Sequence, residues 1–356
     1  MDLFSGFIAG IDSRDSEVAR ACIRLVLKSS KLKEHAISVI GSSKLQPSDI
    51  ALVVSLLRSS DVKPRQCATL SYGKKMSHLA AVDILPLVKE LLRHGSEGLL
   101  VTIDIITMIL HGGMELTGDL LSVLKDALVD PRLFDAAGYD CMMGHNVERM
   151  IALLSQRKLI DLPFARALIN QLLSICTPPR NNVFHDLSSS IRGSLRVLIK
   201  LYPQEVWISI SKLLITDDYF VRHRIDWLLR RENDDHQGPG FLFDLPEAHY
   251  MDWARQDPLN RASIVMKWLP VTKLNDAGDL EWHPTLNRFL SEFGDQDGVL
   301  GALSSRLHPL SWYGPLLPHL QPQIALLETW AAAHSSPKVR QWARDQITWI
   351  KTKADN

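Results

Sequence analysis

A cysteine and a histidine, Cys141 and His145, stand four residues apart and form the pair with the clearest potential for chemistry. Residues at this spacing share one face of a helix, and a thiol beside an imidazole is the nucleophile pair of cysteine enzymes. The sequence offers no third group that would orient the imidazole. A buried thiol beside a helix histidine is therefore the favoured interpretation, and we predict no catalytic residue. A cysteine-dependent enzyme is kept as a third hypothesis.

Basic and aromatic residues are interleaved in a second segment, which runs from residue 219 to residue 231. Arginine and aromatic side chains together can grip a nucleic-acid strand. Acidic residues follow at once, at Glu232, Asp234 and Asp235, which favours a solvated helix end whose charges pair internally. The candidate binding residues of this segment are Tyr219, Arg222, Arg224, Trp227, Arg230 and Arg231.

Trp312 and Tyr313 lie in a turn-like segment, Ser311 to Pro315, and complete the candidate binding residues. Aromatic residues beside glycine and proline are good anchors at protein interfaces. An equally good interpretation is that Trp312 fills a gap between neighbouring helices. The sequence leaves these two interpretations open.

Acidic and histidine residues are frequent between positions 234 and 249, but their spacing matches no zinc or calcium motif. The segment His111-Gly112-Gly113 lacks the pattern of a phosphate-binding loop and is typical of a helix C-terminus. We therefore expect no metal and no cofactor.

Composition indicates an ordinary soluble protein of 356 residues, with 40 basic and 40 acidic residues. The residues before position 178 carry 20 basic and 19 acidic side chains, so neither half has the excess positive charge typical of nucleic-acid binding. Four scattered cysteines suit reduced, mostly buried thiols. The sequence shows no signal peptide and no membrane span, so we expect a cytoplasmic protein without membrane contact.

Apolar residues recur with helical periodicity along the whole chain, and strand signals are almost absent. Short helical segments such as Leu99 to Leu110 alternate with breaks in which a capping residue precedes proline, as at Asp257-Pro258 and Ser336-Pro337. This pattern is typical of helical hairpins. We predict an all-α fold, built as an array of antiparallel helix pairs.

Four of these helix starts, Asp218, Asp257, Asp297 and Ser336, are separated by 39, 40 and 39 residues. Arginine follows four residues later in three of them, and we expect these pairs to stack between neighbouring repeats. A period near 40 with two helices per unit is typical of HEAT and armadillo arrays. The segment Ser336-Pro-Lys-Val-Arg340 with Ala343 resembles the second helix of a HEAT repeat, and Asp218 to Leu228 is a looser copy. The resemblance covers residues 218–350 and implies an α-solenoid.

All nine tryptophans lie after residue 206, and a turn-rich segment, 177–182, separates the two halves. We predict two sub-arrays, residues 1–178 and residues 187–356. The segments 231–246 and 270–284 are long for connections in a helical array. Because long loops gather on one face of such arrays, often the binding face, we expect a recognition surface in the second half.

The C-terminal sequence, from Trp253-Ala-Arg-Gln-Asp-Pro258 to Val339-Arg-Gln-Trp-Ala343, resembles helical regions of large bacterial signalling and immune-type proteins. That resemblance implies a non-catalytic scaffold or sensor that binds a protein partner, within a larger signalling or antiviral defence assembly. The alternative is a nucleic-acid-binding HEAT-like protein, similar to the DNA glycosylases of that architecture. The neutral charge of the chain argues against this alternative.

Overall fold

The computed structural model describes residues 2–29, 31–72, 75–116, 118–134, 141–177, 184–229, 244–307 and 316–354. In this part the chain consists of α-helices, short 3-10 helices and one two-stranded hairpin, so the all-α prediction is confirmed. The chain forms two compact units, Met1–Val197 and Leu198–Asn356. This division falls inside a helix, α10 (Phe184–Leu201). The predicted break lies earlier in the sequence, and its residues 178–183 are outside the described residues.

Unit 1 is built almost entirely from α-helices that alternate with short connections. Before α10 its helices are α1 (Asp2–Asp12), α2 (Ser16–Lys28), α3 (Ala36–Ile40), α4 (Pro47–Arg58), α5 (Ala81–Leu91), α6 (Gly95–His111), α7 (Gly118–Val129), α8 (Cys141–Gln156) and α9 (Leu162–Leu173). Its 3-10 helices are η1 (Lys33–His35), η2 (Pro64–Leu70), η4 (Leu92–His94), η5 (Pro131–Phe134) and η6 (Ser174–Cys176).

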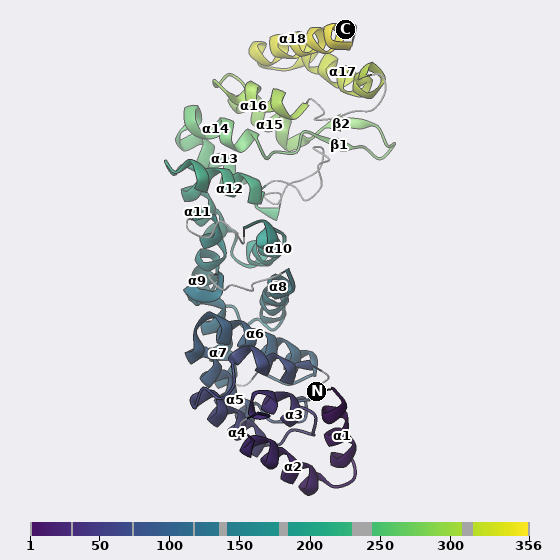
Figure 1. The fold of residues 1–356 in the computed structure, drawn as a ribbon. Helices are drawn as coiled ribbons and strands as arrows, with labels where there is room; N and C mark the ends of the chain where they lie inside the picture. Colours follow the sequence, from purple (N-terminus) through teal and green to yellow (C-terminus); the bar gives the residue numbers. More distant parts are fainter. Residues whose placement is uncertain are drawn as a thin grey trace. The chain divides into compact units, whose positions relative to one another are not determined.

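These helices of unit 1 pack in two layers, and consecutive elements alternate between the layers (Figure 1). One layer contains α4, α5, α7 and α9, each in contact with the next. The other contains α1, α3, η2, α6 and α8, again in consecutive contact. The 3-10 helix η2 therefore occupies a place that an α-helix occupies elsewhere in its layer. Its proline at the first position, Pro64, and the burial of Cys67 and Leu70 fix it there.

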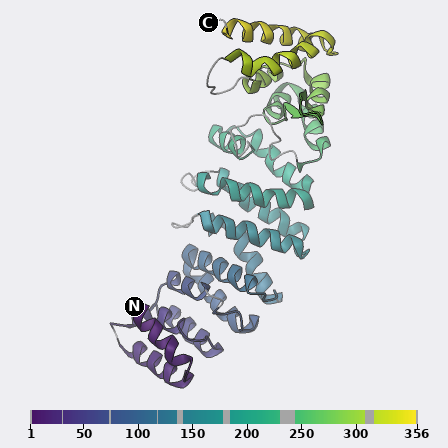
Figure 2. The same ribbon diagram turned by 90° about the vertical axis from the view of Figure 1, so that its right-hand side faces the viewer.

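In the residues that the structure describes, unit 2 contains eight further α-helices and the hairpin. Its helices are α11 (Pro203–Leu214), α12 (Tyr219–Leu229), α13 (Glu247–Gln256), α14 (Pro258–Met266), α15 (Pro284–Phe293), α16 (Val299–Leu307), α17 (Leu316–Ala333) and α18 (Pro337–Ala354). Strands β1 (Thr272–Leu274) and β2 (Leu280–Trp282) pair antiparallel within a segment predicted to be irregular. Contacts join α14 to α16 and α16 to α18, and Figure 2 shows α17 and α18 lying side by side.

Local sequence signals explain where the helices begin and end. Asp218, Asp257 and Ser336 cap the helices that follow them, because a side-chain oxygen of each accepts a backbone N–H of the first turn. The predicted C-cap after α6 is confirmed, since Gly113 adopts a positive φ and the amide of Met114 bonds to a carbonyl of α6. Asp297-Gly298, which lies within a helical sequence pattern, is instead a turn with a positive φ at the glycine.

Most tryptophans of unit 2 are buried between helices. Four indole N–H groups donate hydrogen bonds to residues 38 to 44 positions away: Trp268 to Asp226, Trp282 to Leu326, Trp330 to Asn287 and Trp342 to Ser304. Trp282 and Trp330 also stack face to face, with ring centroids 3.7 Å apart. Trp349 on α18 differs from these residues, because it is 42% exposed.

Candidate functional site

The exposed aromatic residues of α12 form the clearest candidate surface in unit 2. Tyr219 and Phe220 are 66% and 65% exposed, and Trp227 is 40% exposed. The ring of Tyr219 lies nearly parallel to that of His223, with centroids 6.2 Å apart, and at an edge to that of Phe220. Large apolar side chains exposed together on a folded protein are typical of an interaction site.

The α12 face, by which we mean Tyr219, Phe220, Arg222, His223, Arg224 and Trp227, has a defined arrangement. At about 100° per residue, the aromatic side chains and His223 fall on one stripe of the helix. Arg222 and Arg224 lie on opposite flanks of that stripe, and Arg224 is half-buried while Arg222 is exposed. Arg222 makes no ion pair with any residue that the structure describes. The face therefore combines an aromatic centre with positive charge.

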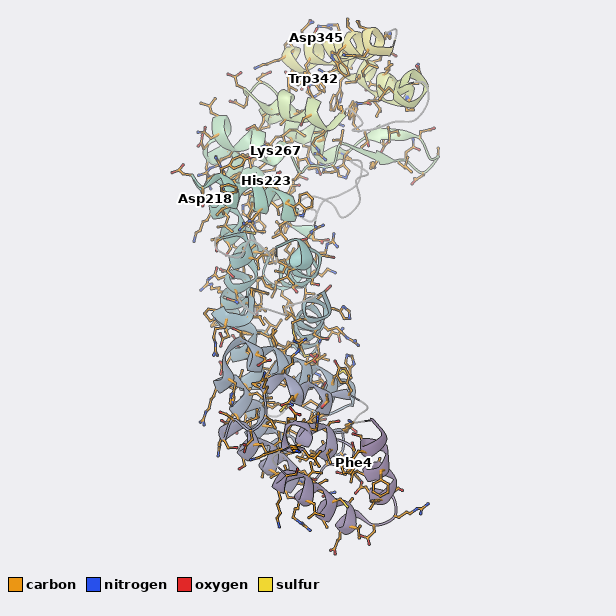
Figure 3. All side chains as sticks on the ribbon, viewed as in Figure 1. Phe4, Asp218, His223, Lys267, Trp342 and Asp345 are labelled. Atoms are coloured by element: carbon orange, nitrogen blue, oxygen red, sulfur yellow. The ribbon has the colours of Figure 1, made fainter. Side chains whose placement is uncertain are left out.

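The buried side of α12 holds this face in place. Val221, Ile225 and Leu228 are buried against the unit, which forces the aromatic stripe outward. Asp218 fixes the first turn by accepting the amides of Phe220 and Val221. Figure 3 labels Asp218 and His223, which mark the start and the middle of the face.

The next helix pair repeats part of this arrangement. Leu259, which follows Phe220 by 39 residues, is 67% exposed at the corresponding position of α14. On the other side of the α12 face in the sequence, Ile215, which directly follows α11, is also exposed. Neither Leu259 nor Ile215 was among the predicted binding residues. Leu259 follows Asp257 by two residues, as Phe220 follows Asp218, and this shared spacing could have identified Leu259.

The expected stacking of arginines between neighbouring repeats is wrong for two of the three arginines. Arg261 donates to the carbonyl of Trp253 and to Gln256, both at the end of the preceding helix α13. Arg340 donates to the carbonyls of His334 and Ser335, just after α17. Each arginine thus closes the turn within its own helix pair.

Arg230, Arg231, Trp312 and Tyr313 lie outside the described residues, as does the side chain of Cys141, the first residue of α8. Within the described part of the chain, no group of three histidine, cysteine or acidic residues could hold a metal ion. Glu247, from the acidic segment, pairs instead with Arg288.

A second feature, which the sequence did not indicate, lies in unit 1 between α6 and α8. Here a pocket of about 300 Å³ is lined by Thr107, Leu110, His111, Arg149, Met150, Ala152, Leu153 and Gln156. Arg149 Nη2 donates to Nδ1 of His111 at 3.1 Å. Burial lowers the pKa of His111, and electrostatic interactions with Arg149 and His145 lower it further. His111 is therefore neutral near pH 7, with its proton on Nε2.

Comparisons of the chain with known protein families, with curated proteins and with solved structures find no match. None of the helices that the structure describes combines the length and apolar character needed to cross a membrane.

Proposed function

We propose that the protein is a non-catalytic scaffold of the HEAT-like α-solenoid type that binds another protein. Side-chain hydrogen bonds between residues 33 to 41 positions apart support the repeat. In unit 1, Ser5 pairs with Ser38 and His78 with the carbonyl of Leu45, each 33 residues apart. In unit 2, Ser336 donates to Asp295 across 41 residues. Bonds at such intervals are expected when each helix pair contacts only its neighbours.

The α12 face carries the proposal for binding. Exposure of its aromatic stripe to water is unfavourable, so a partner that covers this stripe is bound with a favourable change in free energy. The positive charge of the exposed Arg222 selects an acidic partner, because complementary charge speeds encounter and disfavours partners of like charge. We infer that the partner presents an acidic segment with apolar side chains that pack on Tyr219, Phe220 and Trp227.

A cytoplasmic location and a place in a larger bacterial signalling or defence assembly belong to the same proposal. Both are supported by the resemblance of the C-terminal sequence to helical regions of such proteins. The size of the native complex, measured by gel filtration of a gentle cell extract, tests this part. Elution of the chain alone at about 40 kDa would count against it.

Site-specific photo-crosslinking tests the binding surface directly. A photoreactive amino acid replaces Phe220 in one variant and Leu25 in the control, because both native residues are 65% exposed. We expect one discrete protein adduct from position 220 in the native cell and none of the same mass from position 25. The adduct should disappear when Arg222→Glu is added, since this change reverses the charge on the flank. Equal adducts from both positions would contradict the proposal.

The nucleic-acid alternative is tested with the same variants. A labelled single-stranded oligonucleotide is titrated with the protein at low salt, where phosphate contacts are strongest. The protein-binding proposal predicts no saturable binding. Tight, salt-sensitive binding that Trp227→Ser and Arg222→Glu both abolish would replace the protein partner with a nucleic acid.

A further inference from the structure

The pocket between α6 and α8 has an apolar floor. Thr107, Leu110 and Met150 line it and are almost fully buried, and Leu153 adds a half-buried wall. Its volume of about 300 Å³ lies at the lower end of the range for small-molecule sites. The pocket belongs entirely to unit 1, so it is independent of the α12 face.

One wall of the pocket is cationic. Arg149 donates to His111 through Nη2, and it makes no ion pair with any residue in the described ranges. An arginine has five N–H donors, so most of its donors are available to a ligand. Because Nδ1 of His111 accepts this bond, its Nε2 carries a proton and is a further donor. Gln156 adds an exposed amide to the lining.

The helix ends near the pocket do not cancel this positive charge. Helix C-termini carry partial negative charge on their last carbonyls. In α6 the carbonyl of Ile109 accepts the amide of Met114, and in α8 that of Leu154 accepts the amide of Leu159. Carbonyls that already accept backbone N–H groups repel an anion less than free carbonyls would.

We propose that this pocket binds a small organic carboxylate with an apolar body. Arg149 and Nε2 of His111 hold the carboxylate, and the apolar body packs on Leu110, Met150 and Leu153. The charge of Arg149 disfavours a cation, and a neutral apolar ligand would cover the guanidinium without giving it a partner. A planar carboxylate matches the paired N–H donors of arginine. One arginine with a neutral histidine suits a single negative charge.

Methionine-methyl NMR of the full chain tests this proposal, because Met150 lies in the pocket while Met251 and Met266 lie in unit 2. The probes are hexanoate and 4-phenylbutyrate, each compared with its primary amide, which has the same shape and no charge. We expect a saturable shift of the Met150 resonance with either carboxylate. The two unit 2 resonances should stay unchanged, and each amide should bind about tenfold more weakly or not at all.

Three variants separate the ligand site from general effects. Arg149→Gln should weaken binding about tenfold or more, and Ala152→Leu should abolish it by filling the pocket. Arg157→Gln, which removes an exposed arginine outside the lining, should leave binding unchanged. Circular dichroism melting confirms that each variant is folded. The proposal fails if carboxylate and amide shift Met150 equally, if no probe shifts it, or if folded Arg149→Gln binds as the native protein does.

Discussion

The indole Nε1 of Trp330 donates a hydrogen bond of 2.9 Å to the side-chain oxygen of Asn287, 43 residues earlier in the chain. Trp330 is buried, and its ring also stacks on Trp282. A single tryptophan therefore joins α17 to α15 and to the hairpin strand β2. The bond fixes the orientation of the ring, and the stack excludes water from it.

The same relationship recurs at Trp268 and Trp342, which donate to Asp226 and Ser304. These three tryptophans thus join elements that lie 38 to 43 residues apart in the sequence. Trp227 differs, because its ring lies on the exposed α12 face. Among these tryptophans, only the exposed Trp227 is therefore part of the candidate binding surface.

Asn287→Ala should lower the free energy of unfolding by about 1–3 kcal/mol, because it leaves the buried N–H of Trp330 without an acceptor. Asn287→Asp, which keeps the acceptor oxygen, serves as the control and should cost less. Urea unfolding followed by tryptophan fluorescence measures both. Equal stability of the alanine variant and the native chain would show that water replaces the lost bond.

Glu90 makes a pH-dependent contribution to the stability of unit 1. Its buried carboxylate accepts a hydrogen bond of 2.8 Å from Arg58, and this bond lowers the pKa of Glu90, helped by the charges of Arg58, Arg93 and His94. A carboxylate whose pKa is lower in the folded than in the unfolded state stabilises the fold at pH values above its unfolded-state pKa. This stabilisation is lost as the pH falls through the folded-state pKa. Glu90→Gln should therefore cost about 1–3 kcal/mol at pH 7.

The difference between Glu90→Gln and the native chain should shrink as the pH falls below the ordinary glutamate pKa of 4.5. Chemical unfolding at several pH values between 7 and 3.5 measures the trend. A constant difference for Glu90→Gln would show that the native carboxylate titrates normally.

Local signals made the helices predictable. The apolar periodicity of Leu99 to Leu110 lies within α6, and the capping residues Asp257 and Ser336 begin α14 and α18 as expected. These features depend on residues within one or two helical turns. The sequence therefore contains enough information to place them, and the all-α class follows from their number.

Features that depend on distant partners were not predictable. Strands β1 and β2 have three residues each, too few for an alternating pattern to appear. The arginines Arg261 and Arg340 have neighbouring carbonyls as partners, a choice that helical spacing alone does not determine. The contact between Arg149 and His111 joins residues 38 positions apart, so the pocket emerges only when α6 and α8 lie together. In contrast, Tyr219 and Trp227 were predicted as binding residues, and their exposure is compatible with that role.

His334 should make unit 2 less stable in mild acid. Its Nδ1 accepts the amide of Ser336, and burial lowers the pKa of His334, with Arg340 lowering it further and Asp295 opposing. The unfolded chain then takes up the proton first, so stability falls as the pH drops below about 6.5. His334→Asn keeps an acceptor and does not titrate. It should lose less stability than the native chain between pH 7.5 and 5.5, measured by thermal melting. If the variant and the native chain lose equal stability over this pH range, groups other than His334 cause the loss.

Lys158 carries a positive φ of 57° at the end of α8, where the chain leaves the helix. A residue with a side chain pays about 1 kcal/mol for this backbone conformation, and glycine does not. Lys158→Gly should therefore raise the free energy of unfolding by about 0.5–1 kcal/mol. Lys158→Ala is the control, since it removes the charge and keeps the unfavourable conformation. If both variants stabilise the chain equally, the charge and not the backbone is responsible.

The α12 face should contribute to binding and not to folding. Tyr219 and Phe220 are about two-thirds exposed, and the residues that anchor α12 are Val221, Ile225 and Leu228 on its opposite side. Exposed side chains of this kind change stability by about 0.5 kcal/mol or less when replaced. The double variant Tyr219→Ser, Phe220→Ser should therefore unfold at nearly the native urea concentration, yet lose the adduct formed from a crosslinker placed at Trp227. Ile225→Ser, in contrast, should lower stability by several kcal/mol because it places a hydroxyl in the core. A strongly destabilised double variant would mean that the aromatic stripe is part of the fold, and a stable variant with an intact adduct would place the binding surface elsewhere.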